Sequence, residues 1–204
     1  MKGQATRERI IRAVIEVLAA NGEIGLRVAD VAERAGVKES TLFYYFKNRQ
    51  ELLETAQLLW YRETYMAIVE PMRGALHFSD TPEQWESAVE KVLLDSFVSS
   101  RIEVRASRAS VAGMAQSSPA VRSELAKINQ EVVDHISGLL KAAADRGWVR
   151  NDVNLEVLTT VLLGLVAGRS FVEIDRDYAH FTEWDAIVIQ NVKDLLRPRS
   201  GQTN

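Results

Sequence analysis

Apolar residues at helical spacing recur along almost the whole chain, and this pattern limits the fold to an assembly of α-helices. No stretch of β-branched residues alternates cleanly with polar ones, as a half-buried strand would require. The four prolines stand at positions 71, 82, 119 and 198, all of which can be helix edges. The sequence therefore predicts an all-α protein of about nine helices.

Capping residues set the ends of the expected helices. The segment 81–84 supplies a threonine N-cap, a proline at the first helical position and a glutamine for the reciprocal cap. The pairs Asn48/Glu51 and Thr182/Asp185 also have capping-box spacing. The expected helices span about 7–22, 28–35, 39–46, 49–69, 82–99, 102–116, 119–146, 155–174 and 182–197.

Charge is divided unevenly along the 204 residues. Residues 1–50 carry nine Lys and Arg against six Asp and Glu, a net charge of +3. The remaining residues carry 16 against 22, a net charge of −6. A basic first segment on an acidic body indicates a polyanionic partner for the first segment alone.

The composition argues against several classes of function. The chain has no cysteine, which excludes disulfides, thiol catalysis and cysteine-bound zinc. Its three histidines share no local motif, and no phosphate-binding loop or nucleophile elbow is present, so we expect no enzyme, metal or other cofactor. No apolar run approaches the roughly 20 residues of a membrane span, and the N-terminus is too polar for a signal peptide. We therefore expect a cytoplasmic protein with no membrane partner.

Residues 28–46 have the spacing of two short helices joined by a tight turn. Gly36 can supply the positive φ that this turn needs, and Ala32 is small where the two helices would cross. This spacing is typical of a helix-turn-helix DNA reader. Helix-turn-helix shapes also occur without DNA, so a protein-binding surface is the alternative.

The second of these helices carries an unusual run of aromatic residues, Phe43 to Phe46. We expect Leu42, Phe43 and Phe46 to hold the helix to its scaffold. The outer tyrosines can then face DNA, because a tyrosine ring packs on a sugar or a thymine methyl while its hydroxyl reaches a phosphate or base edge.

The stretch "TRERIIRAVIEVLAANG" followed by "VADVAERAGVKESTLFYYFKNRQELL" resembles the N-terminal domain of the TetR family of bacterial transcriptional regulators. The matching features include Ala13 and Leu18 in the first helix, Gly22 after it, and the run Thr41–Phe46. The resemblance covers about residues 6–53. It departs from the family pattern in three places: Leu26-Arg27 stands where Thr or Ser often caps the second helix, Phe43 replaces a Tyr, and Arg49 replaces a Lys.

The resemblance implies a helix-turn-helix DNA-binding domain in residues 1–50 and a helical ligand-binding and dimerisation domain in residues 51–204. It implies a repressor that a small, largely apolar or aromatic ligand releases from a palindromic double-stranded DNA operator. The alternative is a ligand-independent DNA-binding or protein-interaction adaptor. The expected DNA contacts are Arg27, Lys38, Ser40, Thr41, Tyr44, Tyr45, Lys47 and Arg49.

Two apolar helices are the expected homodimer interface. The helix at 155–174 is apolar nearly all round, so it is either deep core or an interface. The helix at 182–197 has an apolar stripe, and family members commonly pair these two helices in a four-helix bundle. The residues expected at the interface are Leu158, Leu162, Leu165, Trp184, Val188 and Val192; the alternative for them is monomer core.

Large side chains of the body are candidates for the small-molecule site, and as a set they suit an apolar or aromatic ligand. Each of them also fits plain core packing. Arg101, Arg105 and Arg108 form one basic stripe, which is either an anchor for an anionic ligand or a solvated face. The candidate ligand residues are Trp60, Tyr61, Tyr65, Phe97, Arg101, Met114, Trp148 and Phe171.

Overall fold

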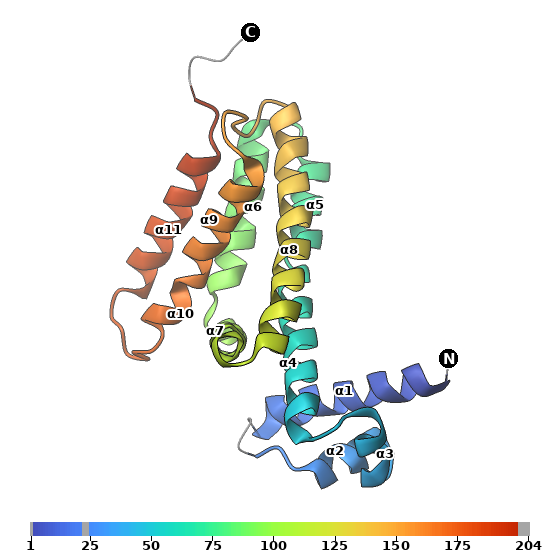
Figure 1. The fold of residues 1–204 in the computed structure, drawn as a ribbon. Coiled ribbons are helices and arrows are strands. Elements are labelled where there is room, and N and C mark those ends of the chain that lie inside the picture. Colours follow the sequence, from blue (N-terminus) through green and yellow to red (C-terminus); the bar gives the residue numbers. More distant parts are fainter. Residues whose placement is uncertain (1, 22–24, 200–204) are drawn as a thin grey trace. The chain divides into compact units, whose positions relative to one another are not determined.

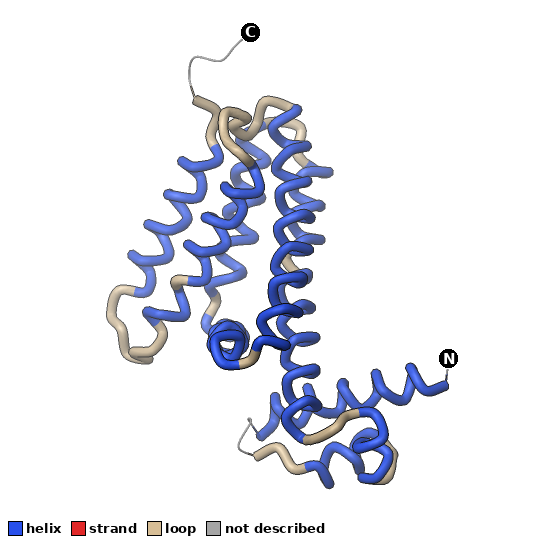
Figure 2. The backbone as a smooth tube through the Cα atoms, viewed as in Figure 1, coloured by secondary structure: helices blue, strands red, loops and turns tan. Residues whose placement is uncertain are grey.

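A computed structural model describes residues 2–21 and 25–199 of the chain. Every regular element in these ranges is a helix (Figure 2), which confirms the all-α class. The predicted end of the first helix at Gly22 lies outside the described residues.

The chain divides into two compact units, Met1–Glu63 and Thr64–Asn204. The boundary expected between residues 50 and 51 falls near the start of α4, whereas the two units meet within this helix. In chain order the elements are α1 (Lys2–Asn21), α2 (Val28–Ala35), α3 (Glu39–Tyr45), α4 (Arg49–Met66), α5 (Val69–Phe78), α6 (Pro82–Phe97), the 3-10 turn η1 (Ser99–Arg101), α7 (Ile102–Ser117), α8 (Pro119–Asp145), α9 (Leu155–Ala167), α10 (Arg169–Val172) and α11 (Phe181–Leu196).

The first unit has its own apolar core. Helix α1 packs against α2, and α2 packs against α3. The beginning of α4 closes this core with Leu52 and Leu53, both fully buried. Most of the remaining core residues come from α1 and α2, at the helical spacing that the sequence shows. The other buried members are Ile10, Ile11, Ala13, Val14, Val17, Leu26, Val31, Ala32, Ala35, Leu42, Phe46 and Ala56.

The second unit is a bundle built around α8, its longest helix, with 27 residues. Helix α8 contacts α5, α7 and α9, while α6 contacts α5 and α11. Helices α9 and α11 lie side by side (Figure 1). The central residues include Trp85 of α6, Leu140 of α8 and Val192 of α11, each almost completely buried.

Several predicted caps are present. The hydroxyl of Thr81 accepts from the backbone N–H of Gln84 at 3.3 Å, and Oδ1 of Asn48 accepts from that of Glu51 at 2.8 Å. Each satisfies one of the donors that the first turn of a helix leaves without a partner. The predicted cap at Thr182 is wrong, because α11 already begins at Phe181.

Two helix boundaries differ from those predicted. The sequence suggests that the fourth helix runs to Val69 ahead of Pro71, but α4 ends at Met66 and the new helix α5 begins at Val69. A proline in a first turn removes an N–H that has no helical partner, so Pro71 is compatible with α5. The single helix expected at 155–174 is divided at Gly168 into α9 and α10.

One stretch among the described residues, Leu155–Val172, is long and apolar enough to cross a membrane by length and composition alone. The sequence had led us to expect none. Only 17% of this stretch is buried within the single chain. The stretch thus presents a largely apolar surface, which is also what an interface between subunits requires.

Candidate nucleic-acid interface and apolar pocket

The turn between α2 and α3 has the geometry that the sequence predicts. Gly36 is left-handed, with φ 63° and ψ 41°. Its N–H donates to the carbonyl of Glu33, and the N–H of Val37 donates to the carbonyl of Ala32, both at 3.0 Å. These two bonds form a Schellman motif, which satisfies the last carbonyls of α2 and redirects the chain into α3.

The inner face of α3 fixes the helix to the first unit. Leu42 and Phe46 are 1% and 2% exposed, and the guanidinium of Arg7 lies over the Phe46 ring at 5.1 Å. Phe43, which we expected on this face, is 50% exposed. Its position one residue after Leu42 turns it away from the core, because neighbouring residues on a helix point about 100° apart.

The outer face of α3 presents aromatic and hydroxyl groups. Tyr44 is 82% exposed, and its ring meets that of the half-buried Tyr45 edge-on, with 5.1 Å between centroids. Ser40 is exposed and Thr41 is half-buried on the same short helix. An exposed tyrosine with a fixed neighbour can offer both a ring face and a hydroxyl to a DNA groove.

Two basic residues stand at the ends of α3, and a third stands at the start of α2. Lys38 is the N-cap residue of α3, Arg27 is the N-cap residue of α2, and Lys47 follows α3. All three are exposed. Neither N-cap residue makes a side-chain capping bond. For Arg27 this was expected, because Leu26-Arg27 stands where Thr or Ser often caps the second helix. Arg49 differs, because its half-buried guanidinium donates to the carbonyl of Leu26 at 3.2 Å. It fixes the loop ahead of α2.

The second unit contains a small apolar pocket of about 70 Å³ that is partly open to solvent. Its two aliphatic hydroxyls are engaged within their helices: Ser96 donates to the carbonyl of Val92 and Thr159 to that of Leu155. The wall therefore offers almost only hydrocarbon surface. It is formed by Tyr65, Ile68, Met72, Val89, Val92, Leu93, Ser96, Ile136, Leu140, Thr159, Leu162, Leu163, Val166, Val192 and Leu196.

The predicted ligand residues do not gather in one place. Tyr65 lines the apolar pocket. Trp60 and Tyr61 belong to the first unit. Phe97 is buried and packs edge-on against Trp184, with 5.7 Å between ring centroids. Of the others, Met114 is half-buried on α7, Trp148 lines a different cleft, and Arg101 and Phe171 are exposed.

The arginine stripe of α7 is not a uniform solvated face. Arg105 is buried and paired with Glu173 across 68 residues of sequence, with Nε donating to Oε2 at 2.8 Å. Its Nη1 also donates to the carbonyl of Ser96 at 2.6 Å. This arginine holds α6 and α7 to the end of α10, a role that sequence spacing did not indicate.

A second buried arginine continues this network. Nε of Arg169 donates to Oδ1 of Asp185 at 2.7 Å, and its Nη1 lies 3.5 Å from Glu173. The guanidinium also lies over the Phe181 ring at 4.0 Å, close enough for a cation–π interaction. Burial raises the pKa of Asp185, while the positive charge of Arg169 opposes that rise.

The residues expected at the dimer interface lie on the neighbouring helices α9 and α11 but face different ways. Leu158, Val188 and Val192 are buried within the chain's own core. Leu165 and Trp184 are partly buried against that core, and Leu162 and Val192 also line the apolar pocket. The exposed apolar face of the two helices is instead formed by Val157, Val161 and Ile187, which are 61%, 47% and 63% exposed.

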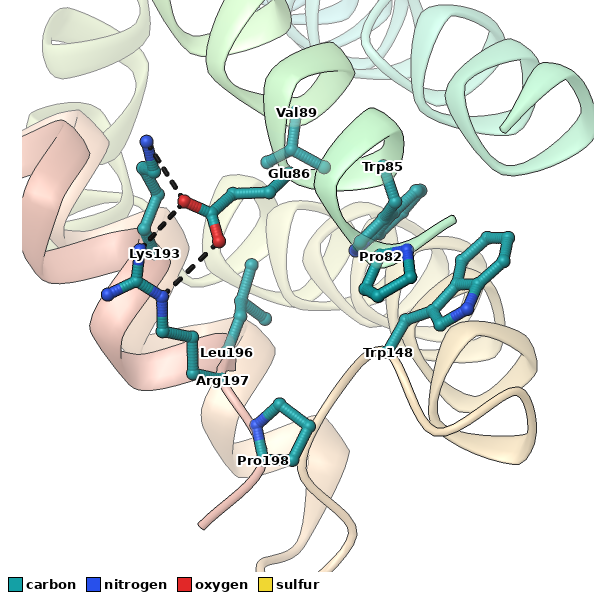
Figure 3. Close-up of a pocket in the computed structure, with 9 residues that line it drawn as sticks. All are labelled: Pro82, Trp85, Glu86, Val89, Trp148, Lys193, Leu196, Arg197 and Pro198. Atoms are coloured by element: carbon teal, nitrogen blue, oxygen red, sulfur yellow. Dashed lines mark hydrogen bonds and ion pairs between the residues drawn. The ribbon is translucent and has the colours of Figure 1, made fainter. Parts of the chain in front are cut away.

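A second cleft lies between Trp148 and the end of α11 (Figure 3). Glu86 closes one side, where it pairs with Lys193 at 3.0 Å and with Arg197 at 2.8 Å. The hydrogen bond from Arg197 is the main cause of the lowered pKa of Glu86. Both carboxylate oxygens of Glu86 are engaged by these two cations, so the cleft presents no unpaired charge from Glu86 to a ligand.

Comparison with known proteins separates the two units. Residues 10–56 match the family model of bacterial regulatory proteins of the tetR family. Over 84 residues the chain is 33% identical to the class C tetracycline repressor protein of Escherichia coli, covering 40% of this chain and 33% of that protein. The specific similarity is therefore concentrated where the helix-turn-helix lies.

Longer matches are weaker but extend through both units. The chain is 24% identical over 170 residues to the transcriptional regulator UidR of Escherichia coli K12, covering 82% of this chain and 81% of that protein. It is 23% identical over 163 residues to the fatty acid metabolism regulator protein of Bacillus subtilis, covering 78% of each.

Solved structures share the fold. A regulator from Rhodococcus sp. described as TetR-family superposes with a TM-score of 0.69 at 24% identity, over 96% of this chain and 100% of that one. FadR of Bacillus subtilis, solved in complex with stearoyl-CoA, superposes with a TM-score of 0.57 at 19% identity, over 93% and 99%.

Proposed function

Because the chain belongs to the TetR family of bacterial regulatory proteins and is a DNA-binding transcriptional regulator, we propose that it is a cytoplasmic repressor released from its operator by an apolar effector. The observation that carries this proposal is the pairing of two surfaces in one chain. The first unit presents an exposed tyrosine helix with cations at its ends, and the second contains a pocket with hydrocarbon walls.

DNA is read by α3 in this proposal. Thr41 and Tyr44 discriminate bases, while Tyr45 and the exposed Lys38 and Lys47 bind phosphates. The exposed outer face of α3 and its rigidly packed inner face support this assignment, because a reading helix must be fixed to its scaffold. Arg27 and Ser40 remain candidate phosphate contacts, and Arg49 acts through the loop that it fixes.

The effector occupies the apolar pocket of the second unit. The pocket of about 70 Å³ is smaller than a typical ligand site of roughly 300–1,000 Å³, so an effector must move its lining side chains apart. Its hydrocarbon wall favours an alkyl chain or an aromatic hydrocarbon over a strongly polar molecule. The Bacillus subtilis FadR that shares this fold was solved with stearoyl-CoA, whose acyl chain has the same chemistry. Of the earlier candidates we retain Tyr65, and we add the pocket wall given above.

The repressor acts as a two-fold dimer through α9 and α11. Val157, Val161 and Ile187 supply an exposed apolar face that burial against a second copy would remove from water. Two readers related by a two-fold axis bind half-sites about 34–36 Å apart, which predicts a palindromic operator.

A reciprocal binding experiment tests the proposal. Duplexes that bind the full-length chain are selected from a random library, and aliphatic alcohols and aromatic hydrocarbons are then titrated against the complex. We expect an effector to weaken DNA binding, and DNA to weaken effector binding by the same factor, since coupling is reciprocal. An apolar compound that occupies the pocket with equal affinity in both states would contradict the control mechanism, and selection that yields no preferred duplex would contradict operator recognition.

A further inference from the structure

The first two turns of α1 lie against the end of α3. A Cβ atom added at Gly3 would stand 3.4 Å from the hydroxyl oxygen of Tyr45 and 4.0 Å from a carbon of its ring. One turn later on α1, the guanidinium of Arg7 lies 5.1 Å from the centroid of the Phe46 ring. Residues four apart on a helix share one face. One face of α1 therefore contacts two consecutive aromatic residues where α3 ends.

The two aromatic residues differ in how firmly they are held. Phe46 is fixed by burial in the core of the first unit. Tyr45 is only half-buried, and the atom nearest to Gly3 is the outer end of its side chain. An alanine methyl at position 3 would just touch that end. A β-branched residue adds carbons on two sides of its Cβ and has one strongly preferred rotamer in a helix, so it competes with the Tyr45 ring for space.

Tyr44 depends on Tyr45 for its orientation. The Tyr44 side chain is exposed, and an exposed side chain changes rotamer within nanoseconds unless a neighbour restricts it. The Tyr45 ring is such a neighbour, because the two rings meet edge-on, an arrangement that aromatic pairs favour. A Tyr45 ring pushed away at its outer end loses this geometry and leaves Tyr44 with more rotamers to sample.

We propose that Gly3 is a specificity-determining position for DNA reading, because it positions Tyr45 and Tyr45 in turn orients Tyr44. The inference rests on α3 as the DNA reader and adds a residue of α1 that acts on it. A larger side chain at this position costs little stability, since Gly3 is exposed and the atom it meets is the end of a flexible side chain. It costs discrimination between bases, which requires a closely defined side-chain geometry.

The test compares Gly3→Ile with Ala5→Ile. Ala5 is exposed and lies two residues further along α1, so the same added side chain points to nearly the opposite side of the helix. Binding is measured at one salt concentration to a duplex selected from a random library. We expect Gly3→Ile to bind it about fivefold more weakly, the lower end of the cost of a lost base contact. It should lose preference at the same base pair as Tyr44→Ala does, whereas Ala5→Ile should bind as the native chain.

A double-mutant cycle separates positioning from a direct collision with DNA. In a Tyr45→Ala chain the ring that Gly3 positions is gone, so adding Gly3→Ile should change DNA affinity by less than about twofold. An isoleucine that collides with the duplex would weaken binding by the same factor in both backgrounds. Circular dichroism melting curves check the fold. If Gly3→Ile does not fold, Gly3→Val replaces it, and Gly3→Ala should bind nearly as the native chain does.

Failure of this role for Gly3 differs from failure of α3 as the reader. If Tyr44→Ala relaxes base preference while folded Gly3→Ile keeps native affinity and preference, the role of Gly3 is overturned and the reader stands. A loss in Gly3→Ile that persists undiminished in the Tyr45→Ala chain, or that Ala5→Ile shares, also overturns it. If Tyr44→Ala itself keeps native affinity and preference, the assignment of the reader fails and the role of Gly3 fails with it.

Discussion

The two units of this protein distribute charge and apolar surface in opposite ways. In the described part of the first unit no charged side chain is buried, and Lys38 and Lys47 lie at the surface beside α3. The second unit buries Arg105, Arg169 and Glu173 and leaves apolar side chains of α9 and α11 exposed. The contrast indicates that exposed basic residues can bind a polyanion, whereas buried basic residues stabilise the fold.

The largest expected effect is the loss of stability when Glu173, the acid of the buried network, is removed. Glu173→Ala leaves the guanidinium of Arg105 without its carboxylate partner and takes a neighbouring charge from Arg169. A buried charge left without its partner costs about 3–5 kcal/mol. Urea unfolding measures the loss. Glu103→Ala, at an exposed pair with Arg176, should leave the midpoint near the native value. Equal urea midpoints for the two variants would mean that the buried network does not stabilise the fold.

An arginine on the exposed apolar face of α9 tests whether the exposed apolar surface of the second unit is a subunit interface. Val161→Arg should prevent association of two copies, because an unpaired charge in a closed interface costs several kcal/mol. It should leave the single chain folded, since Val161 is 47% exposed. Val188→Arg is the matched variant at a buried site and should unfold the chain instead. Sedimentation velocity with circular dichroism separates the two results, and a Val161→Arg dimer would place the interface elsewhere.

Tyr44→Ala tests whether the surface of the first unit serves DNA rather than stability. A lost base contact costs about 1–3 kcal/mol of binding and relaxes preference at one position. Stability should change little, because the side chain is 82% exposed. Lys47→Ala should weaken all duplexes alike and flatten the salt dependence, while Lys91→Ala in the second unit should not. Native operator affinity in folded Tyr44→Ala would exclude α3 as the reader.

The smallest effect concerns the partly exposed ion pairs of Glu86, where the second unit, like the first, carries its charges near the surface. The folded pKa of Glu86 lies below its ordinary 4.5, chiefly through Arg197. Its contribution is therefore complete above the unfolded pKa and is lost as the pH falls through the folded one. We expect a loss of no more than about 1 kcal/mol, absent in Glu86→Gln. Unfolding curves from neutral pH to below 4 measure it, and identical acid dependence in both proteins would contradict the assignment.

Local signals in the sequence predicted much of the first unit. The positive φ of Gly36 and the burial of Leu42 and Phe46 follow from the turn and from helical spacing. Phe43 was misplaced, because its aromatic character suggested burial although its position on the helix turns it outward. Pro71 was taken as a stop, although a first turn tolerates proline.

The second unit was less predictable because its site is made by contacts between distant segments. The pair Arg105 and Glu173 is separated by 68 residues, and no local pattern indicates it. The pocket wall likewise draws on α4, α5, α6, α8, α9 and α11, of which the sequence singled out Tyr65 and, for another role, Leu162 and Val192. The large aromatic residues were uneven guides: Tyr65 lines the pocket, whereas Phe97 packs in the core and Phe171 is exposed.

The hydrocarbon wall of the pocket determines what kind of distinction the protein can draw among related molecules. A wall that is almost entirely hydrocarbon, with the hydroxyls of Ser96 and Thr159 engaged in their own helices, has few directional groups with which to reject a near-isostere. Within a homologous series each added methylene contributes about 0.8 kcal/mol, roughly a fourfold gain in affinity. Selectivity is then graded by length until the space is full, and the regulator would register how long an alkyl chain is rather than what its end carries.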